Sequence, residues 1–250
     1  MGFALYTFGP SEGTPCLWLH GFMGCGMDGK GLADGLDGGH RMICPDLPGH
    51  GATSLSGWDW ENTLEEIARL AKGCRWAGGY SMGGRLLMAA AARHPDAFAA
   101  LVVESASLGY EREEDRLSRR KTDADRAEAL RTLGLEEFCR DWYRLPMWGG
   151  LEAPERRGDP EELAEALERF GSGRQPDLRP WLRSASCPVL WLAGRRDVAY
   201  VSQADWVRRH TSCEVETPDA GHNIHRQRPD AWAAAVRRFE HKLPTGKESD

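Results

Sequence analysis

The sequence predicts an α/β protein in which helices cover both faces of a mostly parallel central sheet. Short apolar runs of β-forming residues alternate with helical patterns, and several runs end in Gly, His, Asp or Ser where the chain turns. This alternation is typical of a parallel sheet wrapped by helices. Because 250 residues fall within the range of one such domain, we expect a single core over residues 1–250.

The expected strands and helices follow in chain order. The strands are short apolar runs bounded by turn residues: Phe3 to Phe8, Cys16 to Leu19, Arg41 to Cys44, Gly73 to Gly78, Ala99 to Val103, Pro188 to Ala193 and Cys213 to Glu216. The helices show apolar residues at helical spacing: about Met27 to Leu36, Glu61 to Ala71, Met82 to Arg93, Gln203 to His210 and Asp230 to Lys242.

The stretch between Ser105 and Cys187 departs from this alternation. It contains charged helical patterns, such as Glu111 to Leu133 and Pro160 to Phe170, and no convincing strand. Its Pro and Gly residues indicate short helices joined by turns. We therefore expect a helical cap insertion at about 107–186 and, after the last helix, a disordered tail at 244–250.

Composition and charge exclude several classes of protein. The chain is 41% hydrophobic and 28% charged, and no apolar run approaches the ~20 residues of a membrane span, so we expect a soluble protein. The start lacks a secretory signal, and seven scattered cysteines without CxxC spacing favour reduced thiols in the cytoplasm over a disulfide framework or a zinc site. A net charge of -6 gives no signature of nucleic-acid binding.

A nucleophile motif occupies an expected strand-to-helix turn. Gly79-Tyr80-Ser81-Met82-Gly83 fits GxSxG, directly after a strand and directly before an Ala-rich helix. The glycines are needed because any side chain there would clash with the neighbouring strand and helix. The Ser81 hydroxyl is then exposed at the carboxyl edge of the sheet, and the Met82 N–H at the helix start is free to bind an oxyanion.

A histidine and an aspartate follow the last two expected strands, at the same edge of the sheet. Asp197 comes just after the strand Pro188 to Ala193, and His222 precedes the last helix. His222 could accept the Ser81 proton while Asp197 fixes its tautomer. Taken alone, His222 could also be a helix-capping or core histidine, but the chain order Ser81, Asp197, His222 is that of a catalytic triad on this kind of sheet.

The loop after the strand Cys16 to Leu19 is expected to supply a second oxyanion donor. It reads His20-Gly21-Phe22, and the Phe22 N–H is the candidate, with His20 as a candidate for substrate binding. His50, in a following turn cluster, is expected to shape the pocket rather than to react.

The motifs HGF, DLPGHG, GYSMGG, GRRD and AGH, between residues 20 and 225, resemble those of the α/β-hydrolase superfamily, which implies the α/β-hydrolase fold and its triad. Further segments resemble the 2-succinyl-6-hydroxy-2,4-cyclohexadiene-1-carboxylate (SHCHC) synthases of menaquinone biosynthesis. These are GYSMGGR, VVESASLG, the arginine-rich stretch from Arg112 to Arg126, Asp141-Trp142-Tyr143, QPDL from Gln175, and AGHNIH. This resemblance implies a lyase that eliminates pyruvate from 2-succinyl-5-enolpyruvyl-6-hydroxy-3-cyclohexene-1-carboxylate, with the serine as the base that removes a ring proton.

The substrate of that family bears several carboxylates, so the resemblance implies fixed cations around the serine. Arg85 lies four residues after Ser81 and therefore faces the same side of the helix one turn further on. A cation in the first turn opposes the helix dipole, so an anion should balance it. Either a substrate carboxylate or Glu104, at the end of the next strand, could do so.

The cap is expected to add carboxylate clamps and an aromatic wall. Arg119 and Arg157 are matched to the family's clamps because a guanidinium binds a carboxylate in bidentate fashion. Since 27 of the 32 basic residues are arginine, close rivals remain at Arg116, Arg120 and Arg156. Trp142 and Tyr143 would stack on or cap the substrate ring, although packing against the core is the alternative, slightly favoured for Tyr143.

Neither a ligand cluster nor a phosphate loop is recognisable, so we expect no metal and no organic cofactor, only a small-molecule polycarboxylate substrate. Two other functions stay open. One is a serine esterase, thioesterase or C–C hydrolase in which Ser81 forms an acyl-enzyme. The other is a non-catalytic hydrolase-fold binding protein that keeps only the pocket.

Overall fold

The computed structural model describes residues 2–36, 38–156 and 158–244, and this part of the chain contains a seven-stranded central sheet. The strand order is β1-β3-β2-β4-β5-β6-β7, in which β1 at one edge is antiparallel to β3 and the other neighbours are parallel. The strands are β1 (Leu5–Phe8), β2 (Thr14–Leu19), β3 (His40–Pro45), β4 (Ala77–Tyr80), β5 (Leu101–Glu104), β6 (Val189–Leu192) and β7 (Glu214–Glu216). The predicted mostly parallel sheet is confirmed.

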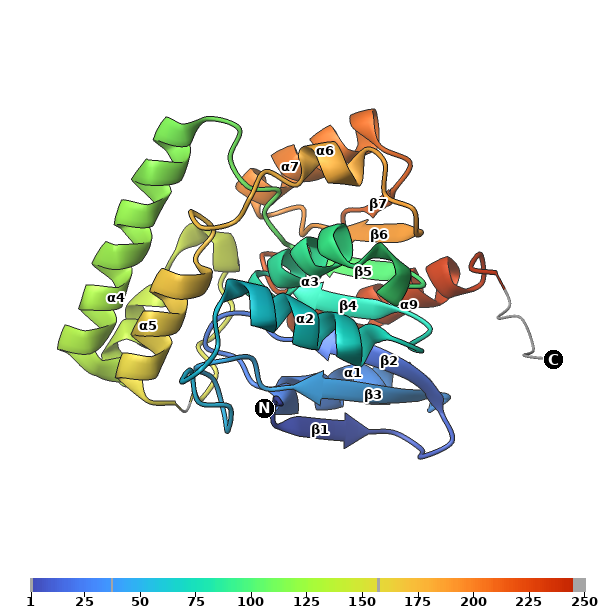
Figure 1. Cartoon of the computed structure of the whole chain (residues 1–250), viewed down its shortest axis with the longest axis horizontal. Helices are drawn as coiled ribbons and strands as arrows, with labels where there is room; N and C mark the ends of the chain where they lie inside the picture. Colours follow the sequence, from blue (N-terminus) through green and yellow to red (C-terminus); the bar gives the residue numbers. More distant parts are fainter. Residues whose placement is uncertain (1, 37, 157, 245–250) are drawn as a thin grey trace.

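Helices cover both faces of this sheet, as predicted (Figure 1). On one face lie α2 (Trp60–Ala71), α3 (Met82–Arg93) and α7 (Val198–His210). On the other face lie α1 (Lys30–Gly35) and α9 (Pro229–Glu240). The sheet is therefore held between two layers of apolar side chains, one on each face, which fix the positions of the strands and their ends.

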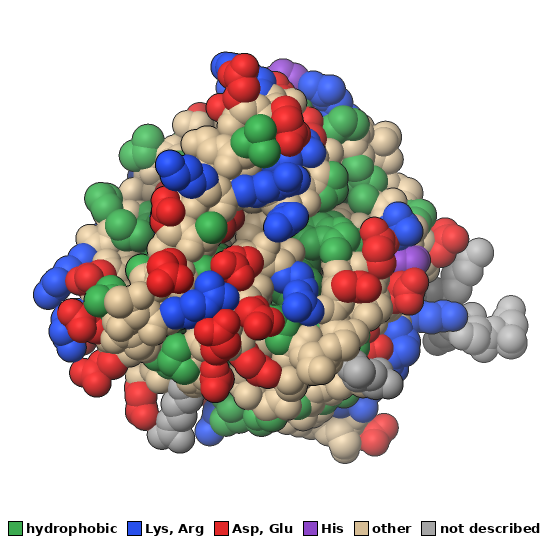
Figure 2. Space-filling model, turned by 60° about the vertical axis from the view of Figure 1, so that its left-hand side comes forward, with side chains coloured by type: hydrophobic (Ala, Val, Ile, Leu, Met, Phe, Trp, Pro, Cys, Tyr) green, Lys and Arg blue, Asp and Glu red, His purple; other side chains and the backbone are tan. Residues whose placement is uncertain are grey.

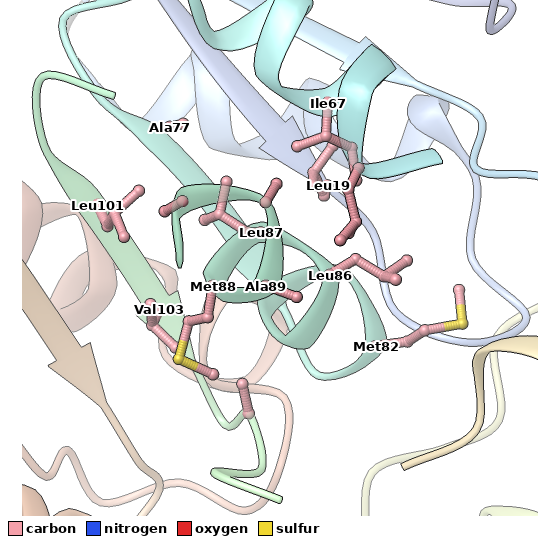
Figure 3. Close-up of a cluster of buried hydrophobic side chains, with 14 of the residues drawn as sticks. Leu19, Ile67, Ala77, Met82, Leu86, Leu87, Met88, Ala89, Leu101 and Val103 are labelled. Atoms are coloured by element: carbon pink, nitrogen blue, oxygen red, sulfur yellow. The ribbon is translucent and has the colours of Figure 1, made fainter. Parts of the chain in front are cut away.

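Side chains alternate between the two layers along each buried strand, as the two-residue period of a strand requires. In β5, Leu101 and Val103 belong to the core under α3, whereas Val102 belongs to the core on the opposite face. Figure 3 shows Leu86 and Met88 of α3 in the core under this helix, together with Leu101 and Val103 of β5. Because α3 lies between the sheet and α2, it is apolar on almost every side, and its bounds were predicted correctly.

Several element boundaries differ from the sequence prediction, and two of the differences involve glycine. The strand expected from Gly73 begins at Ala77, because Gly73 has a left-handed φ of 84° and turns the chain after α2. The helix expected to end at Leu133 continues as α4 (Glu113–Trp142), because Gly134, with a φ of 76°, joins a second helical segment at a kink. The sequence alone did not distinguish a stop from a kink.

The segment between β5 and β6 forms a helical cover, as expected for about 107–186. It contains α4, η3 (Pro146–Trp148), α5 (Pro160–Phe170) and α6 (Arg179–Leu182), with no strand among its described residues. α4 and α5 lie side by side at the end toward which the parallel strands point (Figure 1). This cap lies beside the sheet edge where the functional side chains were predicted.

No helix of the described chain is long and apolar enough to cross a membrane. The seven cysteines are free thiols. The predicted tail at 244–250 lies, apart from Pro244, outside the described residues. A short 3-10 helix, η1 (Gly26–Gly29), precedes α1, and α8 (Ile224–Gln227) follows the loop that carries His222.

Candidate active site

Ser81 lies at the turn between β4 and α3, with a strained backbone. Its φ of 51° and ψ of -109° are outside the regions that residues with a side chain favour, at a cost of about 1–3 kcal/mol. The Ser81 N–H donates to the Glu104 carbonyl at 2.9 Å, and the Arg85 N–H donates to the Ser81 carbonyl at 3.0 Å. The sheet and the helix therefore hold the turn from both sides and present the hydroxyl at the sheet edge.

Glycines flank this turn because the backbone segments approach too closely for a side chain. A Cβ at Gly79 would lie 2.7 Å from the Gly83 carbonyl carbon, and a Cβ at Gly83 would lie 2.4 Å from the Leu19 carbonyl oxygen. A Cβ at Gly84 would lie 2.8 Å from the Ala106 side chain. The steric reason predicted for the motif is confirmed.

His222 and Asp197 reach Ser81 from two other loops at this edge. His222 Nε2 lies 3.0 Å from Ser81 Oγ, and His222 Nδ1 lies 2.6 Å from Asp197 Oδ2. With Nδ1 protonated and donating to the carboxylate, Nε2 can accept the proton of the hydroxyl. Both side chains are 2% exposed, so water competes little for either hydrogen bond. The arrangement can make Ser81 a base or a nucleophile.

Aromatic rings and a cap hydrogen bond fix the imidazole of His222. The rings of Trp148, Tyr80 and Tyr200 have centroids 5.3, 5.4 and 4.6 Å from its own. The His222 N–H donates to the Met147 carbonyl at 2.8 Å. Met147 and Trp148 belong to η3 of the cap, so the cap helps to orient the triad.

The two residues expected to supply oxyanion donors, Phe22 and Met82, both lie at the pocket beside Ser81. Met82 is the first residue of α3, so its N–H has no acceptor within the helix. The loop that carries Phe22 packs on the turn, because a Cβ at Gly21 would lie 2.7 Å from the Tyr80 ring and 3.5 Å from the Ser81 Cβ. Phe22 and Met82 both line the pocket at Ser81. This placement supports the expected oxyanion pair.

His20 lies behind this loop and does not line the pocket. Its Nε2 accepts the Leu47 N–H at 2.9 Å, and its Nδ1 lies 2.7 Å from the Gly21 carbonyl oxygen, so both ring nitrogens are used within the fold. The ring of His50 packs against it at 5.1 Å between centroids, and burial, followed by the neighbouring His20, lowers the pKa of His50 to about 3. The position of His20 thus argues for a role in shaping the loop rather than in binding substrate.

The pocket at Ser81 combines aromatic walls with cationic groups. Three arginines, Arg85, Arg119 and Arg126, share its lining with Trp142 and the triad. No carboxylate side chain is among the described residues that line it. The pocket therefore favours a ligand that has a ring or another apolar part and that also carries negative charge.

Arg85 is a buried cation without an ion pair among the described residues. Its side chain is 7% exposed, and Nη1 has no hydrogen-bond partner. Burial, followed by repulsion from Arg119, lowers the pKa of Arg85 to about 10. Glu104, the alternative partner predicted for it, is instead 2.9 Å from His225 Nδ1. Glu104 is therefore not the partner of Arg85.

Arg119 and Arg126 enter the pocket from α4. Arg119 Nε donates to Asp123 Oδ1 at 2.7 Å, and the Arg126 guanidinium lies 4.9 Å from the centroid of the Trp142 ring. Arg119 and Trp142 are therefore at the pocket, where they were predicted. Arg126 was not singled out, although its position seven residues after Arg119 places it on the same helix face and could have indicated it.

Tyr143 has structural contacts instead of a place in the pocket. Its ring packs on Trp148 at 4.5 Å between centroids, and its hydroxyl accepts from Arg156 at 3.3 Å. Arg156 also forms an ion pair with Asp28 at 2.8 Å. The packing alternative for Tyr143 is thus the one observed. Arg157 lies outside the described residues.

One cluster of potential metal ligands in the described chain lies away from this pocket. Ligand atoms of Cys16, His40 and Glu240 are within 4.8 Å of one another, near the starts of β2 and β3. His40 Nε2 is 2.8 Å from Glu240 Oε1, which also accepts the Trp76 indole N–H at 2.6 Å. Hydrogen bonds already occupy this carboxylate oxygen, and the cluster does not touch the triad.

A serine on a strained strand-to-helix turn, joined to a histidine and an aspartate at the carboxyl edge of a parallel sheet, defines an enzyme of the α/β-hydrolase type. The 2-succinyl-6-hydroxy-2,4-cyclohexadiene-1-carboxylate synthase of Yersinia pestis is 35% identical over 240 residues, which cover 89% of this chain and 86% of that protein. The chain belongs to the alpha/beta hydrolase family, whose model matches residues 16–235, and within it to the SHCHC synthases.

Solved structures show the same relationship. MenH from S. aureus matches with a TM-score of 0.86 and 27% identity, over 98% of this chain and 99% of that one. A thermophilic esterase from Thermogutta terrifontis matches with a TM-score of 0.73 and 24% identity, over 97% and 94% of the two chains. The second match shows that esterases share the fold, so the fold alone does not define the reaction.

Proposed function

We infer that the protein is an SHCHC synthase, a lyase of menaquinone biosynthesis that eliminates pyruvate from 2-succinyl-5-enolpyruvyl-6-hydroxy-3-cyclohexene-1-carboxylate. Similarity to a named synthase over 89% of the chain supports the reaction. The observation that carries its chemistry is the buried Arg85 in the pocket of Ser81 and His222, a cation with no ion pair in the part of the chain that the structure describes. A neutral ester gives no reason to bury an unbalanced cation beside the serine, whereas a substrate with three carboxylates does.

The bonding of the substrate defines what the triad must do. Ring carbon C2 lies next to the succinyl ketone, which makes its proton acidic, and C5 carries the enolpyruvyl oxygen. Ser81, having given its proton to His222, removes the C2 proton. The C2 electrons then form a C2–C3 double bond, the C3–C4 double bond moves to C4–C5, and the C5–O bond breaks. The leaving enolpyruvate takes up the proton held by His222 and becomes pyruvate.

Electrostatic stabilisation follows from the same geometry. Charge that develops at C2 spreads onto the succinyl ketone oxygen, for which the N–H groups of Phe22 and Met82 are the proposed donors. The charge of Arg85 holds a carboxylate of the substrate one helical turn from Ser81. Asp197 keeps the imidazole of His222 in the tautomer that accepts a proton from the serine.

Pyruvate release from this substrate tests the proposal, and reduction by NADH and lactate dehydrogenase reports it. Wild-type protein should release pyruvate far faster than buffer, and Ser81→Ala should lower kcat by ~10³-fold or more. Wild type that is no faster than buffer would reject the synthase. A burst of alcohol from an activated ester, with a stable acyl group on Ser81 in the intact mass, would favour the serine hydrolase instead.

We further propose that the ligand is a small polycarboxylate and that the enzyme works in the cytoplasm. The three pocket arginines support the first statement. Seven free thiols, of which Cys16, Cys44, Cys74 and Cys139 are buried, support a reducing compartment.

A further inference from the structure

Among the described residues, Asp123 is the one acid that forms ion pairs with any of the three arginines of the pocket. Asp123 is buried, and its Oδ1 lies 2.7 Å from Arg119 Nε but 3.9 Å from Arg126 Nη1. Asp123 therefore balances Arg119, while Arg126 has a weak ion pair and Arg85 has none among the described residues. The proposed substrate carries three carboxylates, on the ring, on the succinyl chain and on the enolpyruvyl group.

Arginines of α4 outside the pocket form closer ion pairs than Arg126 does. Arg131 bonds both oxygens of Glu168, and Arg140 pairs with Glu136 at 3.3 Å. Acidic and basic side chains are interleaved over the cap side of the molecule (Figure 2). The cations of the pocket are thus not part of a broad basic surface, and Arg126 differs from its neighbours on the helix.

Arg126 lines the pocket two helical turns beyond Arg119 on α4. It follows Arg119 by seven residues, which is about 10 Å along a helix axis. Burial, followed by Arg119, lowers the pKa of Arg126, and burial, followed by Arg119, lowers the pKa of Arg85. Arg119 is thus the cation that most affects both of the others, and Arg85 is the one that lies one helical turn from Ser81.

A line of contacts leads from the oxyanion donors to Arg126. The Phe22 ring meets the Trp142 ring edge-on at 6.0 Å between centroids, and the Arg126 guanidinium lies over that same Trp142 ring. With the succinyl ketone at the Phe22 N–H, its carboxylate lies three carbon–carbon bonds further, about 4 Å. The two methylene groups would then run along the indole, toward the guanidinium.

We propose that Arg126, held over the face of Trp142, binds the succinyl carboxylate of the substrate and sets the specificity for that chain. The assignment rests on the proposed function and leaves Arg85 and Arg119 for the ring and enolpyruvyl carboxylates. Contact with the indole face restricts the guanidinium, and its N–H groups, which make no hydrogen bond among the described residues, can form a bidentate contact. A lysine at this position could supply the charge but not the fork.

Steady-state pyruvate release separates this role from a structural one. A carboxylate remote from the reacting carbon is bound in the ground state and in the transition state, so Arg126→Met should raise KM ~10–100-fold and change kcat less than ~3-fold. Arg126→Lys should give an intermediate KM. Arg140→Met, on the exposed face of the same helix, should match wild type. An unchanged KM in Arg126→Met, with wild type active, overturns the assignment.

Titration calorimetry with two benzoates measures how much the succinyl carboxylate contributes to binding, and it requires no turnover. The first is 2-succinylbenzoate, and the second is 2-(4-methylpentanoyl)benzoate, in which an isopropyl group replaces the succinyl carboxylate. Wild type should bind the first ~10–100-fold more tightly, and Arg126→Met should bind both equally. A wild type without this preference, or a preference kept by Arg126→Met, contradicts the site.

The two failures are distinguishable. A wild type that prefers 2-succinylbenzoate through Arg126 but releases no pyruvate would contradict the proposed function and leave the carboxylate site in place. A wild type that releases pyruvate and shows no role for Arg126 would contradict only the site.

Discussion

Replacing Arg85 with methionine should stabilise the folded protein while it removes most of the activity. Methionine keeps the length of the aliphatic stem and removes a charge that is 7% exposed and has no ion pair among the described residues. Burial, followed by Arg119, lowers the pKa of Arg85 to about 10. Since a tenfold change in a proton equilibrium corresponds to ~1.4 kcal/mol, keeping this guanidinium charged costs about 3 kcal/mol.

We therefore expect Arg85→Met to raise the free energy of unfolding by about 1–3 kcal/mol in urea titrations at pH 7. The kcat/KM for pyruvate release should fall ~10²–10³-fold, because a charge-assisted contact to a carboxylate is lost. Arg93→Met, at the exposed end of the same helix, is the control and should leave both quantities almost unchanged. A destabilised Arg85→Met protein would refute the reasoning, since it would mean that the arginine already has a stabilising partner.

Three further substitutions test the turn, the triad and the loop behind it. Gly83→Ala should lower the free energy of unfolding by about 3 kcal/mol, because its Cβ would lie 2.4 Å from the Leu19 carbonyl oxygen; a loss under about 0.5 kcal/mol in urea would contradict the packing. Asp197→Asn should lower kcat ~10²–10⁴-fold with an unchanged circular dichroism spectrum, and a loss below tenfold would exclude its role in fixing the tautomer. His50, with a pKa of about 3, stays neutral in the folded protein but protonates in the unfolded chain below pH 6.5, so stability should fall as the pH falls from 6.5 toward 3, by up to about 1.4 kcal/mol per pH unit. Urea titrations of His50→Asn between pH 4 and 7 should show a shallower slope than wild type, and an equal slope would rule out His50 as its source.

The turn and the triad were predictable because their chemistry leaves local marks in the sequence. A strained Ser81 needs glycine where backbone segments touch, and the structure gives the distances that exclude a side chain at Gly79 and Gly83. Asp197 and His222 each follow a strand directly, so the order of strands in a parallel sheet brings them to one edge. The sequence pattern and the topology together determine the position of the triad almost completely.

The cap was less predictable because the register of a helix decides which side chains reach the pocket. Trp142 and Tyr143 are adjacent in sequence, but successive residues of a helix point about 100° apart, so one faces the pocket and the other packs on Trp148. Arg126 was missed for a related reason, since only its spacing from Arg119 distinguishes it from the other arginines of α4. In a chain so rich in arginine, residue type carries little information.

The sequence could not show which group balances the charge of Arg85. Glu104 ends the strand next to β4 and was an equal candidate for its partner. In the structure, the Glu104 carboxylate accepts the Ile224 N–H at 2.7 Å and contacts His225, which ties the loop of the triad histidine to the sheet. Only the three-dimensional position of α8 shows that this acid is already used.

Single-turnover pyruvate release from substrate deuterated at C2, with the intact mass of the enzyme recorded at each time point, tests the central claim most directly. If Ser81 is the base, the deuterated substrate reacts more slowly than the ordinary one, Ser81→Ala loses the reaction, and the protein never gains mass. Equal rates for the two substrates together with a transient acyl mass on Ser81 would contradict the account.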